Sequence, residues 1–546
     1  MFRHAKFRLG WSLLSTIIAS LVLFPLLALV WISLGNNDGV WSHLSSTVLS
    51  DYVVTSLALM LGVGAVTLVI GIASAFLITH FNFSGKRFFE WALLLPLAVP
   101  TYITAYSYTG LLDVAGPTQT ALRNTFSLKT GEYWFPEIRS LGGAIFVMGF
   151  VLYPYVYLLA RAAFLEQSSN LRDVARVLGY SKRQAFIKIT LPVARPAIIA
   201  GLSLALMETL ADFGAVSYFG LSTFTTGIFR TWYGLDSVAG AAQLSLVLLS
   251  FVMVLIIIEK ASRKRASYQN KKSQQAFVAT QLRGRQNIIA IGLVSTPLLL
   301  GFLVPIAQLL IWAIETHAEL FSITFWQLVL NTIGLAAITA LLAVVLAFLV
   351  AYASRVKPGL TTRFAKLGVS LGYAVPGTVI AVGTLVPLAR LDNSIDAWFR
   401  DNFDISTGLI LSGSLVALVI AYLVRFLAVA LGSIDSGLTS IHRNIDQAAR
   451  SLGHKPFFVM RKIHIPLLRS SVFTAALIVF VDVMKELPAT LILRPFNFNT
   501  LAVRAYELAN DERLMDASLA SIAIVLAGLL PVVLLTKASL NTDAKT

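Results

Sequence analysis

The stretch DVARVLGYSKRQAFIKITLP (residues 173–192) returns in outline as QAARSLGHKPFFVMRKIHIP (residues 447–466). Three pairs that coincide at a constant offset of 274 positions are Ala175 with Ala449, Gly179 with Gly453, and Pro192 with Pro466. Because the chain has 546 residues, this offset is about half its length. A polar, basic loop that occurs once in each half indicates that the chain contains an internal repeat.

The rest of the chain is strongly apolar, with 57% hydrophobic and 13% charged residues. The charged share is about half of that in an ordinary soluble domain. A helix needs about 20 apolar residues to cross a bilayer, and twelve runs reach that length, so the expected fold is an all-α polytopic membrane protein. These runs lie near 11–33, 53–79, 88–113, 141–163, 198–218, 241–258, 287–313, 327–353, 367–389, 408–432, 471–493 and 518–536.

The repeat divides the twelve runs into two parallel halves of six, because an even number of spans per half gives both halves the same orientation. We expect a first half at 1–262, a basic linker at 263–286 and a second half at 287–546. With both termini in the cytoplasm, most of the 43 Lys and Arg residues fall on the cytoplasmic side. The linker is either a tether between fused halves or a regulatory or lipid-binding segment.

Each repeated loop, at 165–197 and 433–470, reads as two short helices joined by a turn. Glycine suits the left-handed residue that ends the first helix, and the sequence SKRQ (181–184) fits a capping box that opens the second. We expect Pro192 and Pro466 to end the second helix of each loop. The alternative is an ordinary amphipathic helix on the membrane surface.

Carboxylates within apolar runs are costly and mark candidate functional sites. Glu208 and Asp212 lie in the fifth run of the first half, and Asp482 and Glu486 take the same positions in the second half. Each pair has i,i+4 spacing, so both carboxylates share one helix face. They predict a cation pathway, because hard cations prefer oxygen ligands; the alternative is a packing role, with the charges satisfied by Lys485 or backbone amides.

Tyrosines in the third and fourth runs add a weaker indication of a ferric pathway, since phenolate oxygen is a hard ligand. The alternative is that they serve packing and the aromatic belt. These tyrosines are Tyr102, Tyr106, Tyr108, Tyr153, Tyr155 and Tyr157.

The sequence contains no phosphate-binding loop of the form GxxxxGK[ST] and no evident catalytic constellation among its seven His residues. We therefore predict no enzymatic activity, no bound cofactor and no catalytic residues in this chain. The absence of Cys excludes disulfides and Cys-ligated metals. The net charge of +16 is assigned to loops at the membrane rather than to nucleic-acid binding.

The repeated loops resemble the EAA loop of ABC importer permeases, the segment by which such a permease docks on its cytoplasmic ATPase. The resemblance implies a type I, MetI-like fold, ATP hydrolysis by a separate subunit, and two docking sites for two ATPase copies. The usual Glu of that motif is replaced by Asp173 in one loop and Gln447 in the other. The residues implied in coupling are Asp173, Ala175, Gly179, Pro192, Gln447, Ala449, Gly453 and Pro466.

Residues 95–113, 153–164 and 484–514 resemble ferric iron importer permeases with two fused halves. This implies Fe³⁺ as the substrate, a periplasmic ferric-binding protein as a partner, and a bacterial inner membrane with its lipid as the location.

A permease for thiamine or another small cation in the same family is the first alternative function. A gradient-driven secondary transporter is a second, although the repeated loop between spans four and five favours the ABC class. A non-transporting membrane scaffold would leave the paired carboxylates unexplained.

Overall fold

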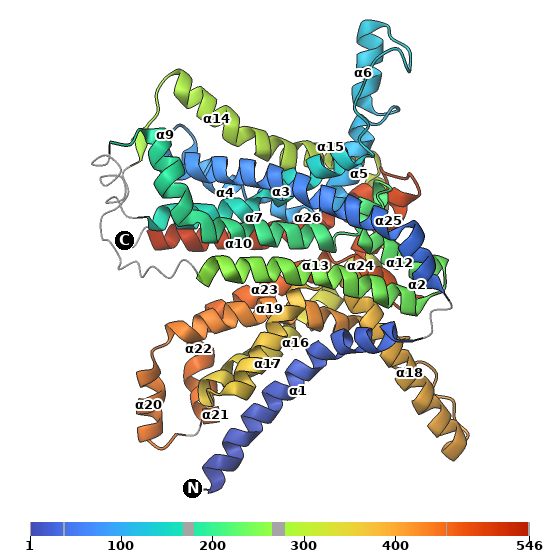
Figure 1. The fold of residues 1–546 in the computed structure, drawn as a ribbon, viewed down its shortest axis with the longest axis vertical. Coiled ribbons are helices and arrows are strands. Elements are labelled where there is room, and N and C mark those ends of the chain that lie inside the picture. The colour runs from blue at the N-terminus through green and yellow to red at the C-terminus, as the bar shows by residue number, and fades with distance from the viewer. Residues whose placement is uncertain (1, 36–38, 168–178, 265–278, 455, 544–546) are drawn as a thin grey trace. The chain divides into compact units, whose positions relative to one another are not determined.

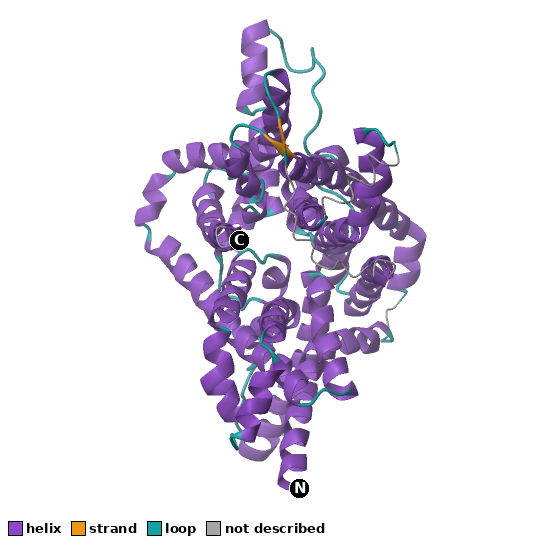
Figure 2. Cartoon of the chain, turned by 90° about the vertical axis from the view of Figure 1, so that its left-hand side faces the viewer, coloured by secondary structure: helices purple, strands orange, loops and turns teal. Residues whose placement is uncertain are grey.

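A computed structural model describes residues 2–35, 39–167, 179–264, 279–454 and 456–543. The described chain is almost entirely helical, as Figure 2 shows. Its only strands are the two-residue β1 (Phe81–Asn82) and β2 (Thr280–Gln281), which pair in parallel. The expected all-α class is confirmed.

Eight described helices are long and apolar enough to cross a membrane, and three bent helix pairs raise the number to eleven. The last predicted run appears as a shorter apolar helix at Ala517–Val533. The count of twelve spans therefore stays a prediction. The linker expected at 263–286 lies largely outside the described residues, and the domain boundaries around it also stay a prediction.

The chain forms two compact units. Unit 1 comprises Met1–Leu44, Gly227–Leu249 and Ala318–Arg504, and unit 2 comprises Ser45–Thr226, Ser250–His317 and Ala505–Thr546. Elements whose residues are divided between the units are α2 (Val40–Thr47), α12 (Phe224–Gly234), α13 (Val238–Lys264), η4 (His317–Phe321) and α25 (Leu501–Asn510).

Unit 1 is built around α16, α19 and α23, which pack on one another. Its helices are α1 (Phe2–Ser33), α16 (Ile323–Val356), α17 (Leu360–Leu371), η5 (Gly372–Ala374), α18 (Gly377–Phe403), α19 (Leu415–Ser440), α20 (Arg443–Ser451), α21 (Pro456–Val459), η6 (Met460–His464), α22 (Ile465–Leu467), α23 (Arg469–Met484) and α24 (Pro488–Leu493).

Unit 2 is built around α3, α7 and α10, which run side by side in Figure 1. Its helices are α3 (Leu49–His80), α4 (Lys86–Ala92), η1 (Leu95–Ala98), α5 (Thr101–Leu112), α6 (Pro117–Phe126), α7 (Leu141–Glu166), α9 (Lys182–Ala185), η2 (Phe186–Thr190), α10 (Leu191–Ala211), α11 (Gly214–Tyr218), α14 (Arg285–Leu298), η3 (Leu299–Leu303), α15 (Val304–Glu315) and α26 (Ala517–Asp543).

Small residues allow the three central helices of unit 2 to approach closely. A Cβ added to Gly201 would lie 2.7 Å from the carbonyl oxygen of Tyr155, and one added to Gly71 would lie 2.7 Å from Cβ of Val156. Helices that pack within a membrane use such small residues because no hydrophobic effect drives them together there. A larger side chain at either glycine would force the helices apart.

The first helix of each half packs with residues of the other half. Helix α1 contacts α16, α17, α18 and α19 of the second half, whereas α14 and α15, which open the second half, contact α3, α4 and α5 of the first half. The two halves defined by the sequence repeat are therefore not the same as the two compact units of the structure.

Both predicted third spans are bent instead of straight. The break falls after the repeated Ala-Val-Pro sequence: the helices before and after it differ in direction by 92° at Pro100 and by 115° at Pro376. Both prolines have φ −58° and ψ 145°, an extended conformation that interrupts the helix. The apolar runs predicted at 88–113 and 367–389 each contain this bend.

Candidate functional site

The repeated loop of unit 1 has the predicted turn between two short helices. Helix α20 ends at Ser451, and Gly453 follows in the left-handed conformation with φ +80°. The amide of His454 donates to the carbonyl of Ala449 at 3.0 Å, which is the long hydrogen bond of a Schellman C-cap. A Cβ at Gly453 would meet nothing within 4 Å, so the backbone conformation, not crowding, is what favours glycine here.

The repeated loop of unit 2 is described from Gly179 onward, so Asp173 and Ala175 lie outside the described residues. Gly179 has φ +71°, the same conformation as Gly453. The amide of Ser181 donates to Oε1 of Gln184 at 3.0 Å, and the amide of Gln184 donates to Oγ of Ser181 at 3.3 Å. This reciprocal pair is the capping box that the sequence predicted.

Pro192 does not end its helix, so that prediction is wrong. The π-helical segment η2 ends at Thr190, two residues before it, and α10 runs from Leu191 through Pro192 to Ala211. In unit 1 the π-helical segment η6 occupies the equivalent place, and there the helix ends at Leu467, one residue after Pro466. The wider π turn accommodates a residue whose ring would clash with the carbonyl four positions back.

The loop of unit 1 presents apolar side chains at its tip. Leu452 is 76% exposed and Phe457 is 55% exposed, and the ring of His454 stacks on Phe458 with centroids 4.1 Å apart. Gln447 and Pro466 are also exposed, whereas Ala449 is buried. Exposed apolar groups beside polar ones are typical of a protein-docking surface.

An ion-pair network that the sequence did not reveal holds α20 in place. Arg355, at the end of α16, donates to Asp446 on α20 at 2.7 Å and to the carbonyl oxygens of Leu438 and Ile441. The ring Nε2 of the buried His464 lies 3.0 Å from the other carboxylate oxygen of Asp446. The base of the loop is thereby tied to the helix bundle of unit 1.

The two pairs of intramembrane carboxylates have defined partners within their own units. Asp212 accepts the amides of Ala215 and Val216, at 3.0 and 3.2 Å, and the hydroxyl of Thr101. It thus caps the short helix α11, which begins within the predicted run 198–218, after α10 ends at Ala211. Glu208 lies half-buried one turn earlier on α10.

Glu486 has the same capping role in unit 1, with a cationic partner in addition. Its Oε1 accepts the amide of Ala489 at 3.0 Å, and its Oε2 pairs with Arg425 at 2.9 Å. Both side chains are buried, at 5% and 10% exposure. A Cβ at Gly377 would lie 2.5 Å from the carboxylate, so this glycine provides space for the pair.

Asp482 pairs with Lys485 at 2.9 Å, as the packing interpretation anticipated. This lysine lies within the predicted run 471–493, between the end of α23 and the start of α24. Among the described residues, no three His, Asp or Glu side chains form a group that could hold a metal ion.

Arg425 lies within the apolar run 408–432 and is not among the charged residues that the sequence analysis singled out. An arginine inside such a run is itself a signal of a functional or structural charge.

Buried tyrosines of unit 2 serve packing. The phenol of Tyr106 bonds to Ser521 at 2.6 Å, and Tyr108, Tyr153 and Tyr157 each donate to a backbone carbonyl. This favours the packing alternative for these four residues.

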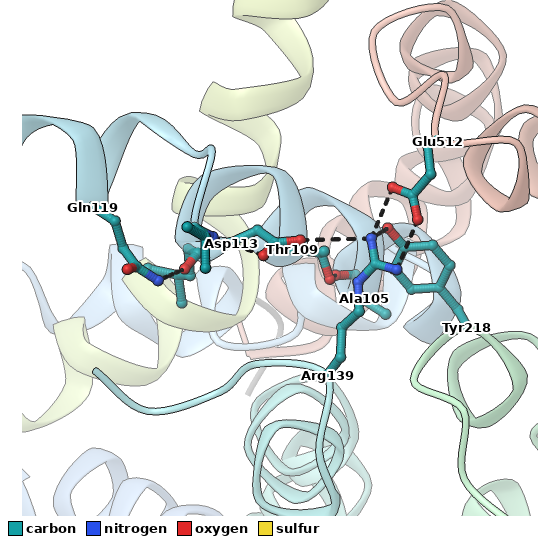
Figure 3. A network of polar contacts seen from close by, with 9 residues as sticks. Ala105, Thr109, Asp113, Gln119, Arg139, Tyr218 and Glu512 are labelled. Atoms are coloured by element: carbon teal, nitrogen blue, oxygen red, sulfur yellow. Dashed lines mark hydrogen bonds and ion pairs between the residues drawn. The ribbon is translucent and has the colours of Figure 1, made fainter. Parts of the chain in front are cut away.

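At the other end of α7 from the repeated loop, a second polar network joins distant segments of unit 2 (Figure 3). Arg139 donates two hydrogen bonds to Glu512, at 2.7 and 2.8 Å, lies 3.6 Å from Asp113 and stacks over the ring of Tyr218. The paired guanidinium lowers the pKa of Glu512 below its usual value. Glu512 itself has φ +60°, a conformation that costs energy for a residue with a side chain.

Two sets of membrane helices, each carrying a loop of this pattern, define the membrane component of an ABC importer. The sequence matches the family described as binding-protein-dependent transport system inner membrane component over residues 67–268 and 343–540. The chain belongs to this family, and its two matched regions fall one in each half.

Three relatives illustrate the family. The Fe(3+)-transport system permease protein FbpB 2 of Haemophilus influenzae is 28% identical over 87% of this chain and 87% of its own length. The sulfate transport system permease protein CysT of Salmonella typhimurium is 30% identical over 38% of this chain and 73% of its own length. The molybdenum transport system permease protein ModB of Escherichia coli is 28% identical over 40% of this chain and 95% of its own length.

Proposed function

We propose that this chain is the permease through which an ATP-driven importer takes up ferric iron delivered by a periplasmic binding protein. The observation that carries the proposal is the extent of similarity to the Fe(3+)-transport permease, which covers 87% of both chains and therefore both halves. The sulfate and molybdenum relatives match about 40% of this chain. The similarity to the Fe(3+)-transport permease therefore extends over helices of both halves, and a transport pathway would be formed by helices of both halves.

Two copies of a cytoplasmic ATPase dock on the two repeated loops, with the N- and C-termini on the same side of the inner membrane. Support comes from the left-handed glycines at equivalent turns and from the exposed Leu452 and Phe457. The sequence contains no phosphate-binding loop, which supports ATP hydrolysis by a separate subunit.

The intramembrane carboxylates Glu208, Asp212, Asp482 and Glu486 line the ferric pathway while the permease faces its binding protein. Negative charge around a low-dielectric passage lowers the barrier for a trivalent cation. In the structure Asp212 and Glu486 bond to backbone amides, and Glu486 and Asp482 pair with Arg425 and Lys485. The ferric site would therefore form only transiently, which agrees with the need for an ion to leave it.

Uptake in a strain that lacks only this gene tests the proposal. Radiolabelled ferric iron, sulfate, molybdate and thiamine are supplied separately, with and without the gene restored on a plasmid. We expect the deletion to abolish high-affinity uptake of ferric iron alone and the plasmid to restore it. Normal iron uptake in the deletion strain would refute the proposed substrate.

Oxyanion transport is the second candidate, because the sulfate permease has the highest identity of the three relatives described above, 30% over its matched region. A loss of sulfate or molybdate uptake in the same strain, with iron uptake intact, would establish it. Loss of thiamine uptake alone would identify the thiamine alternative.

A further inference from the structure

Between α18 and α19, unit 1 carries an arm that extends beyond α16 and α19 in Figure 1. This outer arm is defined here as residues 389–412, the end of α18 and the loop that returns to α19. It joins the start of α19, whereas the repeated loop follows the end of α19. The outer arm therefore lies at the opposite end of this span from the docking loop.

Two carboxylates close the outer arm into a hairpin. Asp392 is fully buried and accepts the amides of Leu411 and Ser412, at 2.9 and 2.7 Å. Asp396, one turn further along α18, accepts the amides of Thr407 and Gly408, at 2.7 and 3.0 Å. Both carboxylates therefore point from α18 toward the backbone of the returning loop.

The other face of the outer arm is apolar and uncovered within unit 1. Leu391 and Trp398 are seven residues apart, two helical turns, and share one face of α18. Leu391 (48%) and Trp398 (54%) are exposed on this face, and four further apolar side chains of the arm are also exposed, namely Phe403 (57%), Ile405 (56%), Leu409 (55%) and Ile410 (48%). Trp398 also packs edge-on against Phe403, with centroids 5.5 Å apart.

We propose that the outer arm lies in the membrane–water interface, with this apolar face buried in the outer leaflet. An amphipathic helix with Trp, Phe and Leu on one face has this position on membranes, and Trp is enriched there in membrane proteins. The proposal goes beyond the transport function and does not depend on which substrate is carried.

Continuity with the lipid-facing surface favours lipid over a docked protein. At the base of the arm, the guanidinium of Arg390 stacks over the ring of Trp31, 4.3 Å from its centroid, near the end of α1. Trp31 is 52% exposed, and Val416, in the first turn of α19, is 43% exposed. The apolar face of the arm thus extends the exposed apolar surface of helices that cross the membrane.

The charge of the arm indicates that hydrophobic contact, not headgroup attraction, would hold it. It contains four Asp residues and two Arg residues, and Arg400 is already paired with Asp396 at 2.7 Å. An excess of negative charge gives no attraction to anionic lipid. We therefore expect the arm to bury its apolar face equally in zwitterionic and anionic bilayers.

The same place in the first half also carries exposed aromatic rings. Between α5 and α7, Phe126 is 66% exposed and Trp134 is 86% exposed. Hydrogen bonds from Arg123 to Tyr133 and from Tyr133 to Gln119 hold this segment of unit 2 together. A second aromatic arm at the equivalent position supports a shared interfacial role.

The cysteine-free sequence allows a direct test. Single-cysteine variants Leu391→Cys, Trp398→Cys and Leu409→Cys are spin-labelled in phosphatidylcholine nanodiscs. Asn393→Cys is the matched control, because it is exposed on the opposite side of α18, two residues after Leu391. Collision rates with dissolved oxygen and with a water-soluble nickel complex report whether each label lies in lipid or in water.

We expect the three apolar positions to collide several-fold less often with the nickel complex, and more often with oxygen, than the control. Replacing part of the lipid with phosphatidylglycerol should leave these ratios unchanged. Leu391→Cys and Leu409→Cys do not remove Trp398, so they test the position of the arm even if Trp398→Cys disturbs folding. Equal nickel access at all four positions overturns the proposal, and is the result that a water-exposed face for docking the binding protein would give.

Discussion

Asp212 and Glu486, which are 274 positions apart in the sequence, accept the amides of Ala215 and Ala489 in the same way, at 3.0 Å each. Each carboxylate lies within a predicted span, just before a short helix begins. Their remaining partners differ: Asp212 accepts the hydroxyl of Thr101, whereas Glu486 pairs with Arg425. The two halves thus share the hydrogen bond from a backbone amide to the carboxylate, but only Glu486 has a cationic partner.

Arg425→Met should strongly destabilise unit 1, because it leaves the buried carboxylate of Glu486 without a cation. Breaking a buried pair by removing one partner costs about 3–5 kcal/mol. We expect the midpoint of thermal unfolding of the purified protein in detergent to fall clearly below that of the wild type.

The double variant Arg425→Met with Glu486→Gln supplies the control. Glutamine keeps an acceptor for the amide of Ala489 and carries no charge, so much of the lost stability should return. If Arg425→Met alone unfolds at the wild-type temperature, the pair makes no net contribution to stability.

Both repeated loops should lie in the cytoplasm, because basic residues are retained on that side. Alkaline phosphatase and green fluorescent protein, fused in turn after Lys188 and after Lys462, report the side of each loop. We expect fluorescence and no phosphatase activity at both sites. A periplasmic readout at either one would contradict the parallel arrangement of the halves.

The turns of the repeated loops could be predicted from sequence because their causes are local. Gly453 and the Ser181–Gln184 pair act through hydrogen bonds within six residues of the chain. The breaks at Asp212 and Lys485 were not predictable in this way, since hydropathy continues through them.

Long-range partners were also beyond the sequence. Arg425 and Glu486 are 61 positions apart, and Arg355 and Asp446 are 91 apart. Nothing in either local pattern identifies the other residue of the pair. The packing of α1 with helices of the second half also joins segments far apart in the sequence, and no local pattern predicts it.

Neutral variants of the capping carboxylates test the ferric pathway. Asp212→Asn and Glu486→Gln keep the shape of each side chain and an acceptor oxygen while removing its charge. If negative charge lowers the barrier for the cation, Asp212→Asn should lose iron uptake while the ATPase still co-purifies. Glu486→Gln leaves the buried Arg425 without its carboxylate partner, so it should also lose uptake in the Arg425→Met background, which removes the unpaired cation. Asp401→Asn, at an exposed position on α18, is the control and should transport normally.

Normal iron transport by both variants and by their combination would mean that Asp212 and Glu486 are structural. Their role would then be limited to capping α11 and α24.

The Arg139–Glu512 pair should make stability depend on pH in the acid range. Because the pKa of Glu512 is lowered in the folded protein, its ionised form stabilises the fold. That contribution is complete above the usual Glu pKa of about 4.3, and it is lost as the pH falls through the lowered value.

Comparison with Glu512→Gln isolates this contribution. The wild type should be the more stable protein at pH 6, and the difference in unfolding midpoint should shrink as the pH is lowered below about 4. The effect should also weaken in high salt, since Glu512 is 59% exposed. A difference that is constant from pH 6 to pH 3 would contradict a role for the ionised pair.

Gly179→Val combined with Gly453→Val should release the ATPase without preventing membrane insertion. Both glycines have positive φ, where a side chain costs about 1–2 kcal/mol and a β-branched one more. The strain falls on the turn of each repeated loop, so the loops should lose the shape that the ATPase is proposed to recognise.

Gly432→Val is the matched control, because Gly432 is an exposed helical residue whose added Cβ would meet nothing within 4 Å. Affinity purification through a tag on this chain should recover a full complement of ATPase with the control, a reduced amount with either single variant, and almost none with the double variant. A double variant that retains the normal complement would show that the turns at Gly179 and Gly453 are not needed for docking.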